Sequence, residues 1–335
     1  MKLLVFSKTA QDMAWRFGIC KAIVTIVFPL AMAGYAPGVT PNPKLVALVP
    51  PGAQVVAGMN TPPLTGQPRS FLLSTHNNTI DYNDFVSLWG VDHSRAIEQI
   101  VMVSTGSGAD PFAEHSLMGV GRFDQALIYR SARNAGAKVI PYRGISVLEV
   151  QPFPRERDSF HEVRWLAMIE SKLAVFGTIG LVQRELDRYL GNSGADPELK
   201  RKLAHLRRND STWCVATLPG HDSEIQEILQ IFEPRFAELL RPGDTVQFGI
   251  RYGRHVELEY EVGMASERDT DVPRRSSEPF ETTPKEASLF PVADLTRVEG
   301  GVRGVLKVPR SQYEARIAEA MAGTEPRAAD VSSNR

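Results

Sequence analysis

Histidines are the residues of this sequence best suited to metal binding or acid–base chemistry. There are seven of them: His76, His93, His115, His161, His205, His221 and His255. A local zinc site needs ligands at short, definite spacings, such as positions i and i+4 of a helix. No two of these histidines lie within five residues of each other, and the sequence has no Cys-x-x-Cys pair. A metal site would therefore have to be assembled from distant residues.

The simplest candidate for such an assembled site is a group of two histidines and two aspartates that are close in sequence: His76, Asp81, Asp84 and His93. The tetrapeptide DYND that begins at Asp81 resembles the start of a calcium loop. Such a loop needs a ligand and then a glycine directly afterwards, where this chain has the apolar pair at 85–86. These four residues define an alternative function, that of a hydrolase or metal-dependent enzyme.

Other patterns that could carry chemistry are incomplete. The loop Ser104–Asp110 (STGSGAD) is rich in glycine but has no lysine, so it does not match a phosphate-binding P-loop. No GxSxG motif is present for a nucleophilic serine. Cys214 lies within the apolar segment WCVATL, where a small buried thiol is expected. We therefore assign no catalytic, cofactor-binding or metal-binding residue from the sequence.

The N-terminal segment resembles a secretory signal peptide. It combines a basic start, the apolar run Ala22–Leu30 and the small-x-small sequence Ala31–Ala33. We predict that residues 1–33 are removed and that the chain is periplasmic or secreted. The alternatives are an uncleaved anchor, although 22–36 is shorter than the roughly 20 residues that span a bilayer, and a buried core helix.

The composition is that of an ordinary globular protein. The chain has 335 residues, of which 43% are hydrophobic and 23% charged, which excludes a disordered chain or a fibre. The formal net charge of −1 provides no basic field for nucleic acid. A predicted basic helix at 197–208 could make weak peripheral contact with anionic lipid, or it could simply be solvated.

Hydrophobic periodicity predicts strands and helices in a mixed order. Strands are expected at 54–59, 97–104, 115–123, 138–141, 145–151, 163–169, 173–176, 213–218, 245–251, 255–262 and 302–308. Helices are expected at 80–89, 125–134, 178–190, 197–208, 223–240 and 311–321. Two series of these elements read β-α-β-β, which suggests an internal duplication.

This order predicts an α+β fold, with antiparallel sheets and helices packed on one face. A linker at 34–45 would precede a first half at 46–191. The basic helix region at 192–210 would connect it to a second half at 211–322. That second half would contain a charged, proline-rich loop at 265–286, and a disordered tail would follow at 323–335.

Several short motifs resemble those of a group of uncharacterised exported bacterial proteins. The motifs are the segment Leu48–Ala57 (LVPPGAQVVA), the VGRFD sequence at 120–124, the YRG turn at 142–144 and the FGT sequence at 176–178. The resemblance covers roughly residues 45–262, and the chain departs from it after 265. It implies a duplicated, ferredoxin-like α+β layout and gives no catalytic residues.

These observations together predict an exported bacterial envelope protein that acts as a non-enzymatic binding or structural module. The leader, the duplicated layout and the lack of a complete catalytic motif support this interpretation. Its partner would be an envelope protein or ligand that the sequence does not identify.

Overall fold

The structure is a computed structural model. It describes residues 40–60, 72–75, 78–81, 97–105, 114–134, 136–150, 163–204, 206, 210–217, 243–263, 294–298, 301–313 and 315. The predicted signal peptide, the loop at 265–286, the helix at 223–240 and the tail at 323–335 lie outside these residues. Within the described part, no helix is both long and apolar enough to cross a membrane.

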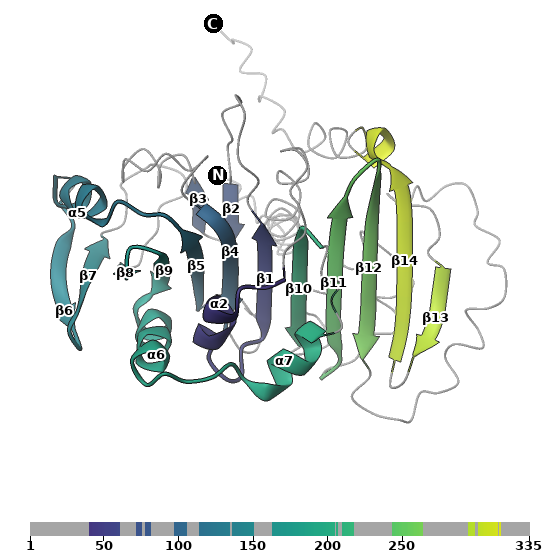
Figure 1. Ribbon diagram of the computed structural model, residues 1–335, viewed down its shortest axis with the longest axis horizontal. Coiled ribbons are helices and arrows are strands. Elements are labelled where there is room, and N and C mark those ends of the chain that lie inside the picture. The colour runs from purple at the N-terminus through teal and green to yellow at the C-terminus, as the bar shows by residue number, and fades with distance from the viewer. Residues whose placement is uncertain are drawn as a thin grey trace, which may run out of the picture.

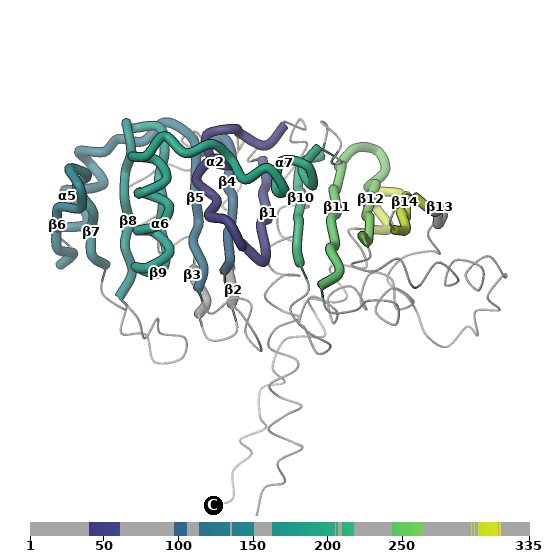
Figure 2. The backbone as a smooth tube through the Cα atoms, turned by 90° about the horizontal axis from the view of Figure 1, so that it is seen from below, coloured from purple at the N-terminus to yellow at the C-terminus, as the bar shows by residue number. Residues whose placement is uncertain are grey.

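Among the described residues, twelve antiparallel strands form one continuous sheet (Figures 1 and 2). From one edge to the other, the strands are β13 (Asp294–Val298), β14 (Gly301–Pro309), β12 (His255–Gly263), β11 (Thr245–Tyr252), β10 (Thr212–Thr217), β1 (Val55–Asn60), β4 (Ile97–Ser104), β5 (His115–Gly121), β9 (Leu173–Thr178), β8 (Arg164–Ile169), β7 (Ile145–Val150) and β6 (Lys138–Tyr142). A separate pair consists of β2 (Leu72–Thr75) and β3 (Asn78–Asp81). The predicted α+β class with antiparallel pairing is confirmed.

The described residues include four helices, α2 (Pro43–Leu48), α5 (Gln125–Asn134), α6 (Ile179–Leu190) and α7 (Pro197–Ala204). Residues 310–313 are also helical, at the start of the predicted helix at 311–321. Apolar residues of α2, α6 and α7 share one core cluster with Val103, Val175 and other residues on one face of the sheet, which we call the helix face. Helix α5 belongs to the cluster on the opposite face. The prediction that all helices pack on one face is therefore wrong for α5.

The order of strands on either side of the β1–β10 pair bears on the two predicted halves. Moving outward from the central pair β1–β10, the strand order is β1-β4-β5-β9-β8-β7-β6 on one side and β10-β11-β12-β14-β13 on the other, so the first side has two more strands, β7 and β6, at its outer end. Both sides belong to a single sheet, so within the described residues the two predicted halves do not form separate sheets. The predicted helix at 223–240 and residues 82–89 of the predicted helix at 80–89 are outside the described residues.

Local sequence explains where the predicted boundaries differ from the structure. The end of the predicted linker forms α2, because the Asn42 side chain accepts a hydrogen bond from Lys44 N (2.9 Å) and Pro43 suits a first helical position. Residues 80–81 belong to strand β3 and not to a helix. The edge strand β13 was not predicted, and α7 ends at Ala204, four residues before the predicted end.

The edge strand β6 is closed by a tight hairpin turn to β7. Arg143 and Gly144 both have positive φ angles (49° and 86°), as a two-residue type I′ turn requires.

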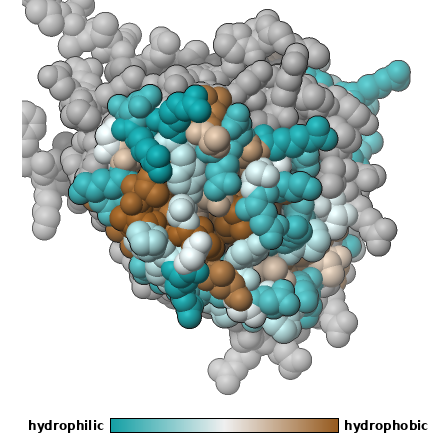
Figure 3. All heavy atoms as spheres, turned by 60° about the vertical axis from the view of Figure 1, so that its left-hand side comes forward, coloured by the Kyte–Doolittle hydropathy of each residue, from teal (hydrophilic) through white to brown (hydrophobic). Residues whose placement is uncertain are grey.

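Figure 3 shows this side of the molecule, where apolar side chains form a patch surrounded by hydrophilic ones. Partly buried Ile140 and Tyr142 of β6 belong to the core cluster of the helix face.

Candidate functional site

The helix face of β11, β12 and β14 carries charged side chains in place of an apolar surface. Strand β12 alternates strictly, so Val256, Leu258, Tyr260 and Val262 enter the core of the opposite face. The three glutamates between them, at 257, 259 and 261, must then lie on the helix face. The alternation visible in the sequence is enough to predict this arrangement.

Cross-strand register pairs these glutamates with basic residues of the neighbouring strands. Glu257 is opposite Arg251 on β11 and Lys307 on β14, and it makes ion pairs with both; its distance to Lys307 Nζ is 3.0 Å. Arg303 is opposite Glu261, with Nη2 2.7 Å from Glu261 Oε2, and its Nε lies 3.6 Å from Glu259 Oε1. Opposite charges in facing positions stabilise a sheet modestly. We call these six residues the charged rows.

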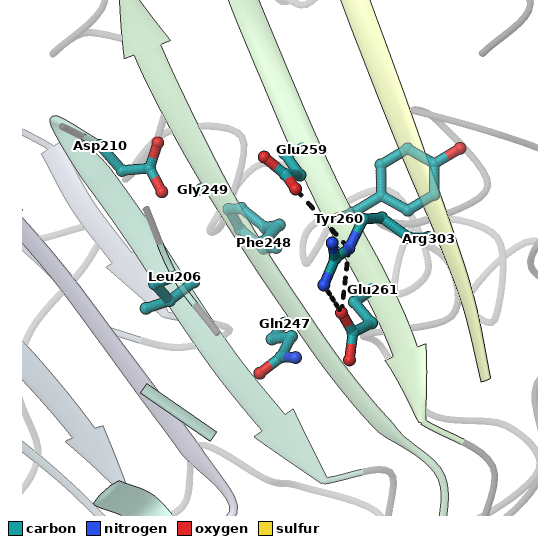
Figure 4. Close-up of a pocket in the computed structure, with 9 residues that line it drawn as sticks. All are labelled: Leu206, Asp210, Gln247, Phe248, Gly249, Glu259, Tyr260, Glu261 and Arg303. Carbon is teal, nitrogen blue, oxygen red and sulfur yellow. Dashed lines mark hydrogen bonds and ion pairs between the residues drawn. The ribbon is translucent and has the colours of Figure 1, made fainter. Parts of the chain in front are cut away.

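A small pocket opens beside the charged rows (Figure 4). It is a shallow hollow with about 10 Å³ open to the centre of a water-sized sphere, and it is lined by Leu206, Asp210, Gln247, Phe248, Gly249, Glu259, Tyr260, Glu261 and Arg303. Figure 4 shows Arg303 held between Glu259 and Glu261, with Asp210 across β11 from them. The lining therefore combines three carboxylates, one guanidinium and one amide.

Glycine 249 makes room for the buried carboxylate of the pocket. Asp210 is 4% exposed, and a Cβ atom at position 249 would collide with its carboxylate group. The Gln247 Oε1 atom is buried and accepts no hydrogen bond from the residues that the structure describes. The carboxylates, guanidinium and amide of the pocket are groups that bind polar or charged partners through hydrogen bonds and ion pairs. Leu206 and Asp210 come from the connection after α7, so strand alternation in the sequence gave no signal for them.

The residues singled out from the sequence are only partly described. Asp81 ends strand β3 of the small sheet, whereas His76, Asp84 and His93 lie outside the described residues. Among the residues that are described, no group of three or more His, Cys, Asp or Glu side chains could hold a metal ion. Cys214 lies in β10 and is buried, and burial raises the pKa of its thiol to about 12.

The basic helix is partly neutralised by its own neighbours. In α7, Lys202 Nζ lies 2.8 Å from Glu198 Oε1 and 3.3 Å from Thr217 Oγ1. Lys200 and Arg201 are exposed. This short helix thus presents two exposed cations, fewer than the basic stretch in the sequence suggests.

Comparison with known proteins finds a weak structural similarity. No protein-family model matches the chain, and no curated protein matches it. A solved structure described as "Structure of crystal form I of TP0453" is similar over 83% of this chain and 97% of that one, with 10% sequence identity and a TM-score of 0.40.

Proposed function

We propose that this chain is an exported protein of the bacterial envelope that works as a non-catalytic binding module, with the charged rows and their pocket as its binding face. The leader-like sequence at 1–33 supports export. The contrast between the two ends of the helix face supports the choice of surface.

That contrast is the observation that carries the proposal. On β4, β5, β8 and β9, the helix face is apolar and buried, with Val101, Met118 and Val175 all 0% exposed beneath α2 and α6. On β11, β12 and β14, the same face carries the charged rows, and Lys307 and Arg303 remain 55% and 37% exposed at their side chains. A sheet face that is rich in paired charges suits contact with water or with a polar partner.

The chemistry of the charged rows indicates the class of partner. Their three acidic side chains lie on β12 and their three basic side chains on the flanking strands β11 and β14, so they offer no field of one sign to nucleic acid or an anionic membrane. A protein or peptide segment with charges of both signs would match this pattern, because electrostatic complementarity mainly provides specificity.

We further propose that the chain arose by internal duplication. The two strand orders that run outward from β1–β10 support this idea, and each side also begins with a helix, α2 before β1 and α7 before β10. The helix face would then have diverged, with one copy keeping a covered apolar face and the other acquiring the charged rows.

Export and binding are tested separately. Mass spectrometry of the protein purified from its host should find a chain that begins at Gly34; an intact Met1 on soluble protein contradicts export.

For binding, a photo-crosslinking amino acid at position 307 should give a discrete adduct in the native envelope. The same group at position 138, whose lysine is 71% exposed at the other end of the sheet, should not.

Charge reversal distinguishes a specific adduct from a random one. Arg303→Glu should abolish the adduct formed at position 307, because it places three acidic side chains together on adjacent strands. Lys138→Glu is the matched control and should leave that adduct unchanged. Equal adducts at positions 307 and 138, no adduct at 307, or an adduct that survives Arg303→Glu would each reject the charged rows as the binding face.

A further inference from the structure

Helix α5 presents an exposed face that combines two arginines with a leucine. The helix lies at the outer end of the sheet, beside β6 and β7, in both views of the backbone (Figures 1 and 2). Its buried residues pack against the face of the sheet opposite α6, and its exposed residues include Ala126, Leu127, Arg130 and Arg133. Spacings of three and four residues place these four on one side of the helix.

The charge on this side of the helix is unbalanced. Helix α5 contains no Asp or Glu. In the segment 122–133 there is one acidic residue, Asp124, whose carboxylate caps the helix, and there are three exposed basic residues, Arg122, Arg130 and Arg133. Neither Arg130 nor Arg133 makes an ion pair or hydrogen bond with another residue that the structure describes. Lys138 of β6 adds an exposed cation nearby, 3.8 Å from Glu149 Oε1.

Leu127 gives this basic surface an apolar centre. Its exposed fraction is 37%, and within the described part of the chain Leu190 is the other large apolar residue that is exposed. Leu127 lies three residues before Arg130, so the two side chains are neighbours on the helix. Cations beside an exposed apolar side chain are typical of a helix that lies at a membrane surface, where the charges meet the head groups.

Helix α7, which the sequence suggested as a lipid contact, presents less of this pattern. Its Lys202 is paired with Glu198 of the same helix. Leu199 is buried, and Leu203 is partly buried in the core of the helix face. Its exposed cations, Lys200 and Arg201, therefore have no large exposed apolar side chain beside them on α7.

We propose that α5 docks this protein on an anionic lipid surface, with Arg130 and Arg133 at the lipid phosphates and Leu127 below them. A guanidinium binds phosphate oxygens in pairs. An acidic protein segment is the other partner that such arginines could bind. A lipid surface fits better, because α5 is a convex element at an end of the sheet and exposes a leucine among its cations. The charged rows lie at the other end of the sheet on the opposite face, so this contact does not depend on them.

Co-sedimentation with lipid vesicles tests this surface. Protein purified from its host should bind vesicles of equal parts phosphatidylcholine and phosphatidylglycerol, bind pure phosphatidylcholine far more weakly, and be released by salt. The double variant Arg130→Gln, Arg133→Gln should weaken binding to the mixed vesicles about thirtyfold, since each cation near an anionic surface contributes about fivefold. Lys200→Gln with Arg201→Gln removes the same charge from α7, and this matched control should bind like the wild type.

A third variant tests the apolar part of the contact. Leu127→Ala keeps the charge, so it should weaken binding about fivefold and leave the salt dependence unchanged. Circular dichroism would establish that each variant is folded. The proposal is overturned if the wild type binds both kinds of vesicle equally or binds neither, if either folded α5 variant binds like the wild type, or if the α7 variant loses as much affinity. Retention of the wild type on immobilised polyglutamate, without binding to mixed vesicles, would assign α5 to an acidic protein partner and reject the lipid surface.

Discussion

At the scale of single residues, two glycines in the sheet leave space that aromatic rings of the neighbouring strands occupy. Gly58 of β1 pairs with Trp213 of β10, and a Cβ at position 58 would collide with the indole ring. Gly304 of β14 pairs with Tyr260 of β12 in the same way. A ring that covers a glycine on the next strand protects its backbone and fixes the register of the pair. Glycine in a strand here marks close approach of a side chain.

Substituting Gly58 tests this reading at the centre of the sheet. Gly58→Ala should lower the free energy of unfolding by about 1–3 kcal/mol, because the fully buried Trp213 ring has no room to move aside. Urea denaturation followed by circular dichroism measures the change. Gly194→Ala is the control, since a Cβ at position 194 meets no atom within 4 Å. Equal stability of the two variants would contradict the packing argument.

A second residue-scale feature is the buried carboxyl group of Glu185 in α6. Glu185 is 0% exposed; its Oε1 accepts a hydrogen bond from Ser116, and its Oε2 has no partner in the part of the chain that is described. Burial raises its pKa from 4.5 to about 8, although Ser116 and Arg184 act in the opposite direction. The side chain is therefore mostly protonated at neutral pH.

The pH dependence of stability follows from this shift in pKa. The folded chain holds a proton on Glu185 that the unfolded chain releases above about pH 4.5, so stability should decrease as pH rises from about 4.5 to about 8 and level off beyond. Each unit of pKa difference corresponds to about 1.4 kcal/mol. Glu185→Gln should remove this decrease, and unfolding free energies measured across that pH range would show it. The exposed-residue control Glu98→Gln should retain the wild-type pH profile.

At the scale of elements, the sequence predicted helix boundaries best where a capping residue or a glycine marks the end of the helix. Helix α5 was predicted at its observed bounds, because Asp124 accepts a hydrogen bond from Leu127 N (2.9 Å) and Gly136 adopts a positive φ of 90°. Helix α2 was missed because a short helix in a proline-rich stretch has the composition of a linker.

The candidate site was predictable in part. The alternation of apolar and charged residues on β12 and β14 places the charged rows on one face of the sheet. Strand β13, which pairs with the outer edge of β14, was not predicted. Neighbours such as Asp210 and Gly249 are brought together by the order of strands in the sheet. No local pattern encodes that order, because it depends on which strands pair across 30 or more residues.

The edge strand β6 makes an element-scale prediction about association. Pro141 removes a backbone donor and Lys138 adds an exposed charge, both of which discourage pairing with another chain. The double variant Lys138→Val, Pro141→Val should therefore associate at concentrations where the wild type does not, as light scattering would detect. The matched control is Lys200→Val with Pro197→Val on α7, which adds similar apolar surface away from any strand. Association of both variants alike would point to general hydrophobicity and not to the edge.

At the scale of the whole molecule, both hydrophobic cores cross the junction between the proposed halves. The core of the helix face joins Trp213 and Leu199 to Val56 and Val101. The core of the opposite face runs from Leu148 on one side to Leu306 on the other. Pairing of β1 with β10 connects them further, with five residue pairs in register. Neither side therefore has a core that is complete without the other.

This shared packing predicts that the sheet unfolds as one unit. Differential scanning calorimetry should show a single transition, and two variants that truncate fully buried side chains on opposite sides, Leu148→Ala and Leu306→Ala, should each shift that whole transition to lower temperature. If the halves were independent, each variant would move only one of two transitions. A stable fragment that ends near position 191 after limited proteolysis would lead to the same contrary conclusion, because it would show that β1 and its neighbours fold without Trp213.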